Sequence, residues 1–263
     1  MGKEIQEVVM NLDYQKIKED LQALGLKKDD AVLVHSSFKS LGSVEGGIQT
    51  VIEALLSVIG DRGTLLGPTL TFSYVTPSKP VFEYANTPSC VGAISEYIRT
   101  MDGAKRSINP THSCTAVGFK RDWYVEGHEK DCTPVGENSP FYKLHQDGGK
   151  VLMLGCRVGA NTSMHGVEEL SGVPYVLTPE KIDHTIVLPE QTYIKGYYRH
   201  NFGIGRNGLG QRYDRLEGVL DPKYMSKGTV HGATSWLIDA PQMWKVGNEM
   251  MKKDTYYFVE KLQ

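Results

Sequence analysis

A histidine and a glutamate three residues apart are the most specific candidates for catalysis in this sequence. His165 and Glu168 follow the apolar run at 151–155, in a stretch expected to form a short helix over residues 162–170. Side chains three apart on a helix share one face, so the carboxylate can orient the imidazole and raise its basicity. Such a pair suits a general base, although a surface or capping histidine beside an unrelated glutamate fits the spacing equally well. A metal site is not expected, because a single HxxE motif lacks the other ligands.

A loop of small polar residues is the second candidate. It spans residues 35–43, HSSFKSLGS, between an apolar strand pattern at 31–34 and a helix pattern at 46–59. Backbone N–H groups and hydroxyls can converge on an anion in such a loop, and the dipole of the following helix adds a favourable potential. The Walker pattern GxxxxGK[ST] is absent, and an ordinary turn explains the composition as well as a phosphate site does.

Other segments point less clearly to chemistry. The polar run RSINPTHS at 106–113 could bind phosphate or line a cleft, although such a run is more often a plain loop. Residues 203–208 match GxGxxG, but no apolar strand precedes them and no apolar helix follows, so a dinucleotide site is not expected. No closely spaced pair occurs among the cysteines, which are expected to be reduced thiols: Cys90, Cys114, Cys132 and Cys156.

Elements of alternating type must position these residues. Helices are expected at 14–24, 46–59, 91–99, 162–170 and 233–251. Strands are expected at 31–34, 64–66, 151–155 and 183–189. The alternation indicates an α/β fold with a mostly parallel or mixed sheet covered on both faces, in one domain over residues 1–263. Residues 190–230 have weak periodicity and are expected to be an inserted loop region or a sheet edge.

The composition excludes several classes of protein. With 263 residues, a net charge of −2, 40% hydrophobic and 23% charged residues, the chain is that of an ordinary globular protein. The near-neutral charge argues against nucleic-acid binding, and no run of about 18 apolar residues predicts a membrane span. Residues 1–7 carry two acids with no apolar stretch after them, so we expect no secretory signal and a cytoplasmic protein.

Several segments, taken in order, resemble the antibiotic N-acetyltransferases, the aminoglycoside 3-N-acetyltransferase family that is distinct from the GNAT fold. They are VHSSFKSLG at 34–42, GTLLGPT at 63–69, RSINPTHSCTAVG at 106–118, PVGENSPFYKL at 134–144, KVLMLG at 150–155 and ANTSMHGVEELSGVPY at 160–175. The last is similar to the family's NTxxHxxE signature. The resemblance implies a single-domain mixed-sheet α/β/α sandwich, acetyl-CoA as the co-substrate, no metal, and an aminoglycoside 3-amino group as the acceptor.

The resemblance also implies roles for individual residues. His165 and Glu168 match the catalytic pair. The expected cofactor-binding residues come from three of the matching segments: His35, Ser36, Ser37, Ser40, Leu41, Gly42, Arg106, Ser107, Asn161 and Thr162. Asn109 stands where the family's RSxHP element has its histidine, so any role of that histidine is in doubt here. In the implied mechanism the amine attacks the thioester directly, without a covalent enzyme intermediate.

The acceptor stays open at this point. Aminoglycosides are polycations, so carboxylates should line their site, and Glu83, Asp214 and Glu217 are the candidates. The arginines of residues 190–230, the expected acceptor-side region, suit an anionic acceptor such as a sugar nucleotide at least as well, and a solvated loop explains them too. A same-fold acyltransferase for another amine, in polysaccharide or natural-product biosynthesis, is the alternative function, and a non-catalytic CoA-binding module is a third. A homodimer is compatible with the sequence.

Overall fold

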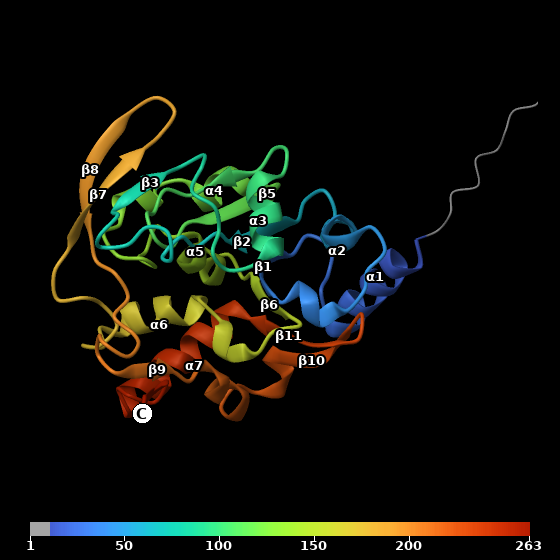
Figure 1. Cartoon of the computed structure of the whole chain (residues 1–263). Coiled ribbons are helices and arrows are strands. Elements are labelled where there is room, and N and C mark those ends of the chain that lie inside the picture. The colour runs from blue at the N-terminus through green and yellow to red at the C-terminus, as the bar shows by residue number, and fades with distance from the viewer. Residues whose placement is uncertain (1–10) are drawn as a thin grey trace, which may run out of the picture.

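A seven-stranded sheet forms the centre of the computed structural model, which describes residues 11–263 (Figure 1). The expectation about a secretory signal concerns residues outside this range. The strand order is β10-β11-β6-β1-β2-β5-β4. The strands are β1 (Ala31–Ser36), β2 (Thr64–Pro68), β4 (Lys105–Arg106), β5 (Cys114–Gly118), β6 (Lys150–Leu154), β10 (Met225–Val230) and β11 (Ala233–Asp239). Strand β1 pairs in parallel with β2 and β6, whereas the other pairs are antiparallel, so the sheet is mixed, as expected.

Helices cover both faces of this sheet. One face packs against α1 (Leu12–Leu24), α2 (Gly47–Ile59) and α3 (Ala93–Thr100). The other packs against α4 (Arg121–Val125), α5 (Pro140–Gln146), α6 (Ser163–Ser171) and α7 (Ala240–Lys253). Side chains alternate between the two cores along each strand, with Leu33 and Val151 on the second face and Val34 and Leu152 on the first. The predicted α/β/α architecture is confirmed.

Two small sheets stand beside the main one. Strand β3 (Val81–Glu83) pairs with β7 (Ile182–Val187), which pairs with β8 (Thr192–Tyr197), while β9 (Leu209–Gln211) pairs with β12 (Val259–Lys261). Short 3-10 helices are η1 (Phe38–Leu41), η2 (His128–Lys130), η3 (Val158–Ala160), η4 (Tyr213–Gly218) and η5 (Pro222–Tyr224). Residues 190–230 therefore contain β8, β9 and β10. All three strands lie at the edge of a sheet, and loops with the short helices η4 and η5 connect them, so the region combines the two expected features.

The helix predicted at 233–251 is wrong for its first part, which forms a strand. Residues Ala233–Asp239 form β11, because Trp236 and Leu237 bury their side chains on opposite faces of the sheet, a two-residue period that no helix provides. The helix begins only at Ala240, where the Asp239 side chain accepts a hydrogen bond from the Gln242 backbone N–H. Within residues 11–263, no helix is both long and apolar enough to cross a membrane.

The parallel strands place two loops side by side. Strands β1 and β6 run in register from Val32 and Lys150 to Ser36 and Leu154, so their carboxyl ends meet at one edge. Helix η1 follows β1 there, and Gly155 follows β6. Gly155 has φ +65°, and a Cβ on it would lie 3.1 Å from the Ser37 carbonyl oxygen, so the close approach of the two loops favours glycine. Open α/β sheets bind ligands at such an edge.

Candidate active site

His165 and Glu168 face each other on α6. Nδ1 of His165 lies 3.1 Å from Oε2 of Glu168, whose side chain is fully buried. The Tyr213 hydroxyl, from η4, donates to the same Oε2 at 2.6 Å and lies 2.8 Å from Nδ1. These acceptors assign the ring proton to Nδ1 and leave a lone pair on Nε2. This geometry suits a general base, and Tyr213 is a partner that spacing did not reveal.

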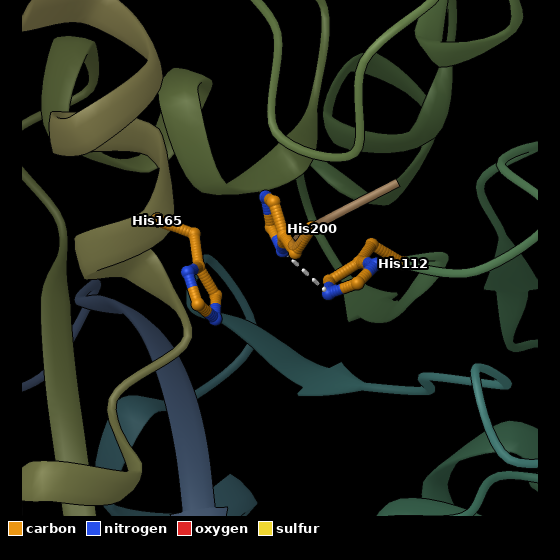
Figure 2. Close-up of side chains that lie close together, drawn as sticks. All are labelled: His112, His165 and His200. Atoms are coloured by element: carbon orange, nitrogen blue, oxygen red, sulfur yellow. Dashed lines mark hydrogen bonds between the residues drawn. The ribbon is translucent and has the colours of Figure 1, made fainter. Parts of the chain in front are cut away.

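Two further histidines lie against His165 (Figure 2). His112 precedes β5 and His200 follows β8, and Nδ1 of His200 lies 3.1 Å from Nε2 of His112. The rings of His165 and His200 have centroids 4.0 Å apart. Burial and the nearby His165 lower the pKa of both His112 and His200 well below the usual value. Both rings are therefore neutral at neutral pH.

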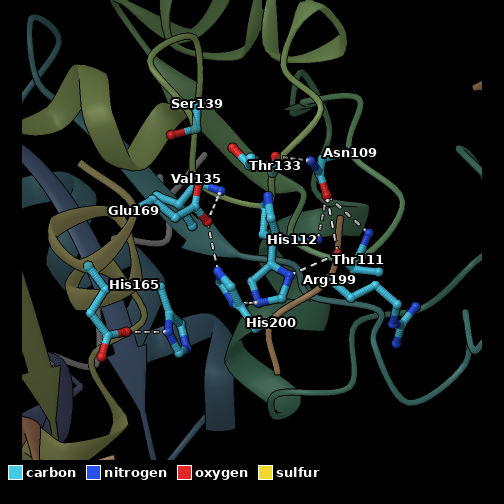
Figure 3. A network of polar contacts seen from close by, with 12 residues as sticks. Asn109, Thr111, His112, Thr133, Val135, Ser139, His165, Glu169, Arg199 and His200 are labelled. Carbon is cyan, nitrogen blue, oxygen red and sulfur yellow. Dashed lines mark hydrogen bonds and ion pairs between the residues drawn. The ribbon is translucent and has the colours of Figure 1, made fainter. Parts of the chain in front are cut away.

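Each of these histidines is held on its outer side (Figure 3). Nε2 of His200 lies 2.8 Å from Oε1 of Glu169, which also accepts the Val135 backbone N–H. Burial raises the pKa of Glu169 to about 8, so a neutral Glu169 carboxyl donates to His200 when no cation is near. Nδ1 of His112 lies 2.9 Å from the Thr111 hydroxyl oxygen.

Asn109, at the position of the family's RSxHP histidine, shapes this loop. Its side-chain oxygen accepts the backbone N–H groups of Thr111 and His112 at 3.1 and 2.9 Å. Asn109 therefore positions His112 rather than reaching the cavity itself. For the polar run at 106–113, phosphate binding, the lining of a cleft and a plain loop were all left open, and two of its residues, Thr111 and His112, line a cavity. No local pattern marked His200.

The three rings open into a small cavity of about 160 Å³. Its lining consists of Phe72, Thr111, His112, His165, Arg199, His200, Phe202, Arg206 and Gln211. None of these residues is acidic. Arg199 donates to the carbonyls of Phe72 and Val75, and Arg206 donates to the carbonyl of His200. Burial lowers the pKa of Arg199 to about 10, which still leaves it cationic at neutral pH.

A larger cleft of about 1230 Å³ adjoins this cavity, and Gln211 lines both. Ser37 and Ser40, with hydroxyl oxygens 2.8 Å apart, line it together with Gly155, Arg157, Lys227 and Trp236, among others. Arg157 and Lys227 bring positive charge to the wall of this cleft. Among the expected cofactor-binding residues, Ser37 and Ser40 are the ones that line this cleft.

Arg106 and Ser107 lie in the core instead. The Arg106 guanidinium donates to the carbonyls of Tyr84, Thr87 and Thr69 and to the Ser113 hydroxyl. The Ser107 hydroxyl contacts Nδ1 of His128 at 2.8 Å and accepts the Cys114 backbone N–H. Both side chains form hydrogen bonds within the core, so we assign them a structural role and leave them out of the proposed cofactor site.

The other expected cofactor residues line neither cavity. They are His35, Ser36, Leu41, Gly42, Asn161 and Thr162. Burial, together with the charge of His165, lowers the pKa of His35 to about 3. Asn161 accepts the Ser163 N–H, and the Thr162 carbonyl accepts that of His165, so these two residues shape the start of α6.

The expected acceptor-binding acids are not brought together. Asp214 and Glu217 line the larger cleft rather than the histidine cavity, and Glu83 in β3 lines neither. Asp214 pairs with Arg212 at 2.8 Å, and Glu217 lies 3.9 Å from Lys227. The charge of Asp214 is thus largely compensated.

Comparison with known sequences identifies the family of this chain. Residues 33–252 match the family model described as aminoglycoside 3-N-acetyltransferase. Over 174 residues the chain is 34% identical to an aminoglycoside N(3)-acetyltransferase III of a Salmonella species, and this match spans 60% of each protein, less than two thirds of the relative. It is 33% identical over 188 residues to the SPbeta prophage-derived aminoglycoside N(3')-acetyltransferase-like protein YokD of Bacillus subtilis, covering 64% of this chain and 69% of that protein.

Solved structures show the same fold. AAC-IIIb, solved as a binary complex with CoASH, matches with a TM-score of 0.78 and 28% identity over 91% of this chain and 96% of that one. A variant of AAC(3)-IVa in complex with a gentamicin matches with a TM-score of 0.79 and 25% identity over 93% and 90% of the two chains. Since the family match covers most of the sequence, this chain belongs to the aminoglycoside 3-N-acetyltransferase family.

Proposed function

We propose that this protein transfers the acetyl group of acetyl-CoA to a primary amine, with His165 as the general base and Glu168 as the residue that orients it. The observation that carries the proposal is the His165–Glu168 contact of 3.1 Å at the wall of a cavity that adjoins a cleft large enough for a nucleotide cofactor. The similarity to a structure that holds CoASH supports the same donor.

Each of the two cavities is assigned one substrate. Acetyl-CoA occupies the larger cleft, where the hydroxyls of Ser37 and Ser40 and the cations of Arg157 and Lys227 can meet its phosphates. The thioester then lies near Gln211, the residue common to both cavities. The acceptor amine enters the smaller cavity beside His165.

The chemistry needs few groups. The amine nitrogen attacks the thioester carbonyl carbon, so a C–N bond forms and the C–S bond breaks. The proton that the amine loses passes to Nε2 of His165 and then to the departing sulfur of CoA. Glu168, hydrogen-bonded to Nδ1, stabilises the imidazolium, and general-base assistance of this kind contributes about 10²–10⁴-fold.

The names of the relatives favour an aminoglycoside 3-amino group as the acceptor. One observation favours a second candidate, an amine that carries a carboxylate or phosphate, such as an aminosugar derivative or sugar nucleotide. The residues that line the histidine cavity include Arg199 and Arg206 and no acid. A polycation would meet like charge there, whereas an anion would find two guanidinium groups.

The test is release of CoA thiol from acetyl-CoA with a panel of aminoglycosides and a panel of amino sugars bearing carboxylate or phosphate, with His165→Ala run in parallel. We expect turnover with at least one panel, a large loss of kcat in the variant, and unchanged acetyl-CoA binding by calorimetry. Equal turnover in His165→Ala would remove this residue from the mechanism. Acetyl-CoA binding without thiol release on either panel would instead indicate a non-catalytic CoA-binding module.

A further inference from the structure

The three histidines of the small cavity come from distant parts of the chain and lie close together (Figure 2). His112 precedes β5, His165 lies on α6 and His200 follows β8. One ring nitrogen of each lies within 4.8 Å of the corresponding nitrogens of the other two. All three residues are at most 9% exposed, so the fold holds these polar rings together in a desolvated place.

We infer that His112, His165 and His200 form a binding site for a divalent transition-metal ion of the Zn²⁺ type. Three imidazoles with an open fourth position are a ligand set that such ions accept, with Zn–N bonds of about 2.0–2.1 Å. The nitrogens around a tetrahedral ion lie about 3.4 Å apart by that geometry. Nδ1 of His200 and Nε2 of His112 are already 3.1 Å apart, and the ligand nitrogen of His165 lies within 4.8 Å of both.

The outer nitrogens support this assignment, because each has an oxygen partner. Nδ1 of His165 meets Glu168, Nε2 of His200 meets Glu169, and Nδ1 of His112 meets the Thr111 hydroxyl. Metal-bound histidines almost always hold their second ring N–H in this way, often against a carboxylate. With protons on the outer nitrogens, the inner nitrogen of each ring keeps a lone pair.

Without an ion, Nδ1 of His200 donates a hydrogen bond to Nε2 of His112 at 3.1 Å, so an ion that binds here replaces that proton. The fourth position would face the cavity of about 160 Å³, which has room for water or a substrate atom. The HxxE motif offers only one histidine ligand, His165, and the fold adds His112 and His200 from other parts of the chain.

A metal ion at this site would occupy Nε2 of His165. Binding of the ion and general-base catalysis therefore compete for one lone pair, so Zn²⁺ inhibits the proposed acyl transfer and a chelator restores it. Only this consequence rests on the proposed function. Metal binding itself is measured without any substrate, so the two proposals fail separately.

The test is calorimetric titration of the untagged full-length chain with ZnCl₂ in a buffer that does not bind metals. We expect one site with a Kd below about 1 μM, weakened about 100-fold or more in His112→Gln and in His200→Gln. His231→Asn, a histidine outside the cavity, is the matched control and should bind like the unaltered protein. Binding that is absent, or that is equal in all variants, would overturn the inference.

A second measurement does not depend on the variants folding. Co²⁺ added to the unaltered protein should give the strong visible absorption bands of a tetrahedral site with nitrogen ligands, and one equivalent of Zn²⁺ should abolish them. An excess of Mg²⁺ should leave the bands in place, because Mg²⁺ prefers oxygen ligands. Weak bands like those of Co²⁺ in water would contradict the site even if some metal bound elsewhere.

Discussion

At the scale of single residues, the proposed catalytic pair, His165 and Glu168, depends on a third partner. Glu168 has no exposed surface, and a buried carboxylate needs donors to hold its charge. The Tyr213 hydroxyl is such a donor, at 2.6 Å from Oε2, and it also touches Nδ1 of His165. Tyr213 lies 45 residues from Glu168 in the chain, so no spacing rule could connect them. The motif predicts the pair, whereas the fold supplies the residue that fixes it.

Replacing Tyr213 with phenylalanine tests this role. Loss of the hydroxyl leaves Glu168 with fewer donors and His165 less well oriented, so we expect kcat to fall about 10-fold with little change in KM for acetyl-CoA. Tyr256→Phe, at a half-exposed tyrosine outside both cavities, is the control and should be silent. An equal fall in both variants, or a change confined to KM, would argue against Tyr213 as a positioning residue.

Two arginines have different expected roles, Arg106 in the stability of the fold and Arg157 in the binding of CoA. Arg106 spends its guanidinium on three backbone carbonyls and a hydroxyl in the core, while Arg157 lines the large cleft. We expect Arg106→Gln to lower the free energy of unfolding by about 3 kcal/mol, because buried carbonyls lose their donors, and to leave the Kd for CoA unchanged. Arg157→Gln should raise the Kd for CoA and leave the free energy of unfolding unchanged. Denaturant unfolding and calorimetry measure the two quantities, and a weaker CoA affinity in a folded Arg106→Gln would restore the role implied by the resemblance.

At the scale of elements, one histidine ties the N-terminal helix to a distant hairpin. His231, in the turn between β10 and β11, pairs with Asp13 of α1 at 3.0 Å and contacts the carbonyl of Leu41 through Nδ1. The hydrogen bond to Asp13 is the main reason why the pKa of His231 is raised. A protonated His231 therefore holds α1, η1 and the hairpin together.

This contact predicts a pH dependence of stability. Because the folded pKa of His231 is raised above its unfolded value of about 6.5, the stabilisation is complete below that value and is lost as the pH rises through the folded pKa. His231→Asn keeps a residue that tolerates the left-handed backbone here, where φ is 47°. The variant should be less stable than the unaltered protein by about 0.5 kcal/mol at pH 5.5, since the contact is partly exposed, and nearly equal to it at pH 9. A difference that grows toward high pH would contradict the ion pair.

Helices and strands could be predicted from the sequence where one hydrophobic pattern dominated. The amphipathic pattern of α2 and the short apolar runs of β1 and β6 fixed these elements to within a few residues. Residues Ala233–Asp239 were misassigned because Trp236 and Leu237 are both apolar, and a strand buried on both faces shows no alternation in its sequence. The Asp239 cap and Pro241 that follow mark the true start of α7.

At the scale of the whole molecule, local motifs anticipated only part of the site. His165 with Glu168 and the loop with Ser37 and Ser40 each lie within a few residues of one another, so their proximity was readable. The walls of the histidine cavity come from five separate stretches of chain around Phe72, His112, His165, His200 and Gln211. Their meeting depends on tertiary packing. The acids chosen for acceptor binding missed this cavity for the same reason, since charge alone does not say where a side chain lies.

The absence of acids among the residues lining this cavity has a measurable consequence for the acceptor. Arg206 lies at its wall, is more exposed than Arg199, and donates to the carbonyl of His200. If the acceptor is an anionic amine, Arg206→Gln removes an attractive charge, and we expect its KM to rise about 10-fold, a loss of about 1.4 kcal/mol, with kcat nearly unchanged. Raising the salt to about 0.5 M should shrink this difference, because a partly exposed pair is screened.

The control for Arg206 is Arg62→Gln, a surface arginine that lines neither cavity. It should leave KM unchanged for every acceptor. A cationic aminoglycoside supplies the opposite arm, since loss of Arg206 removes like-charge repulsion and should lower its KM. An Arg206 variant that changes the KM of neutral, anionic and cationic amines by the same factor would mean that the arginine acts through the position of His200, and the charge of the cavity would then not select the acceptor.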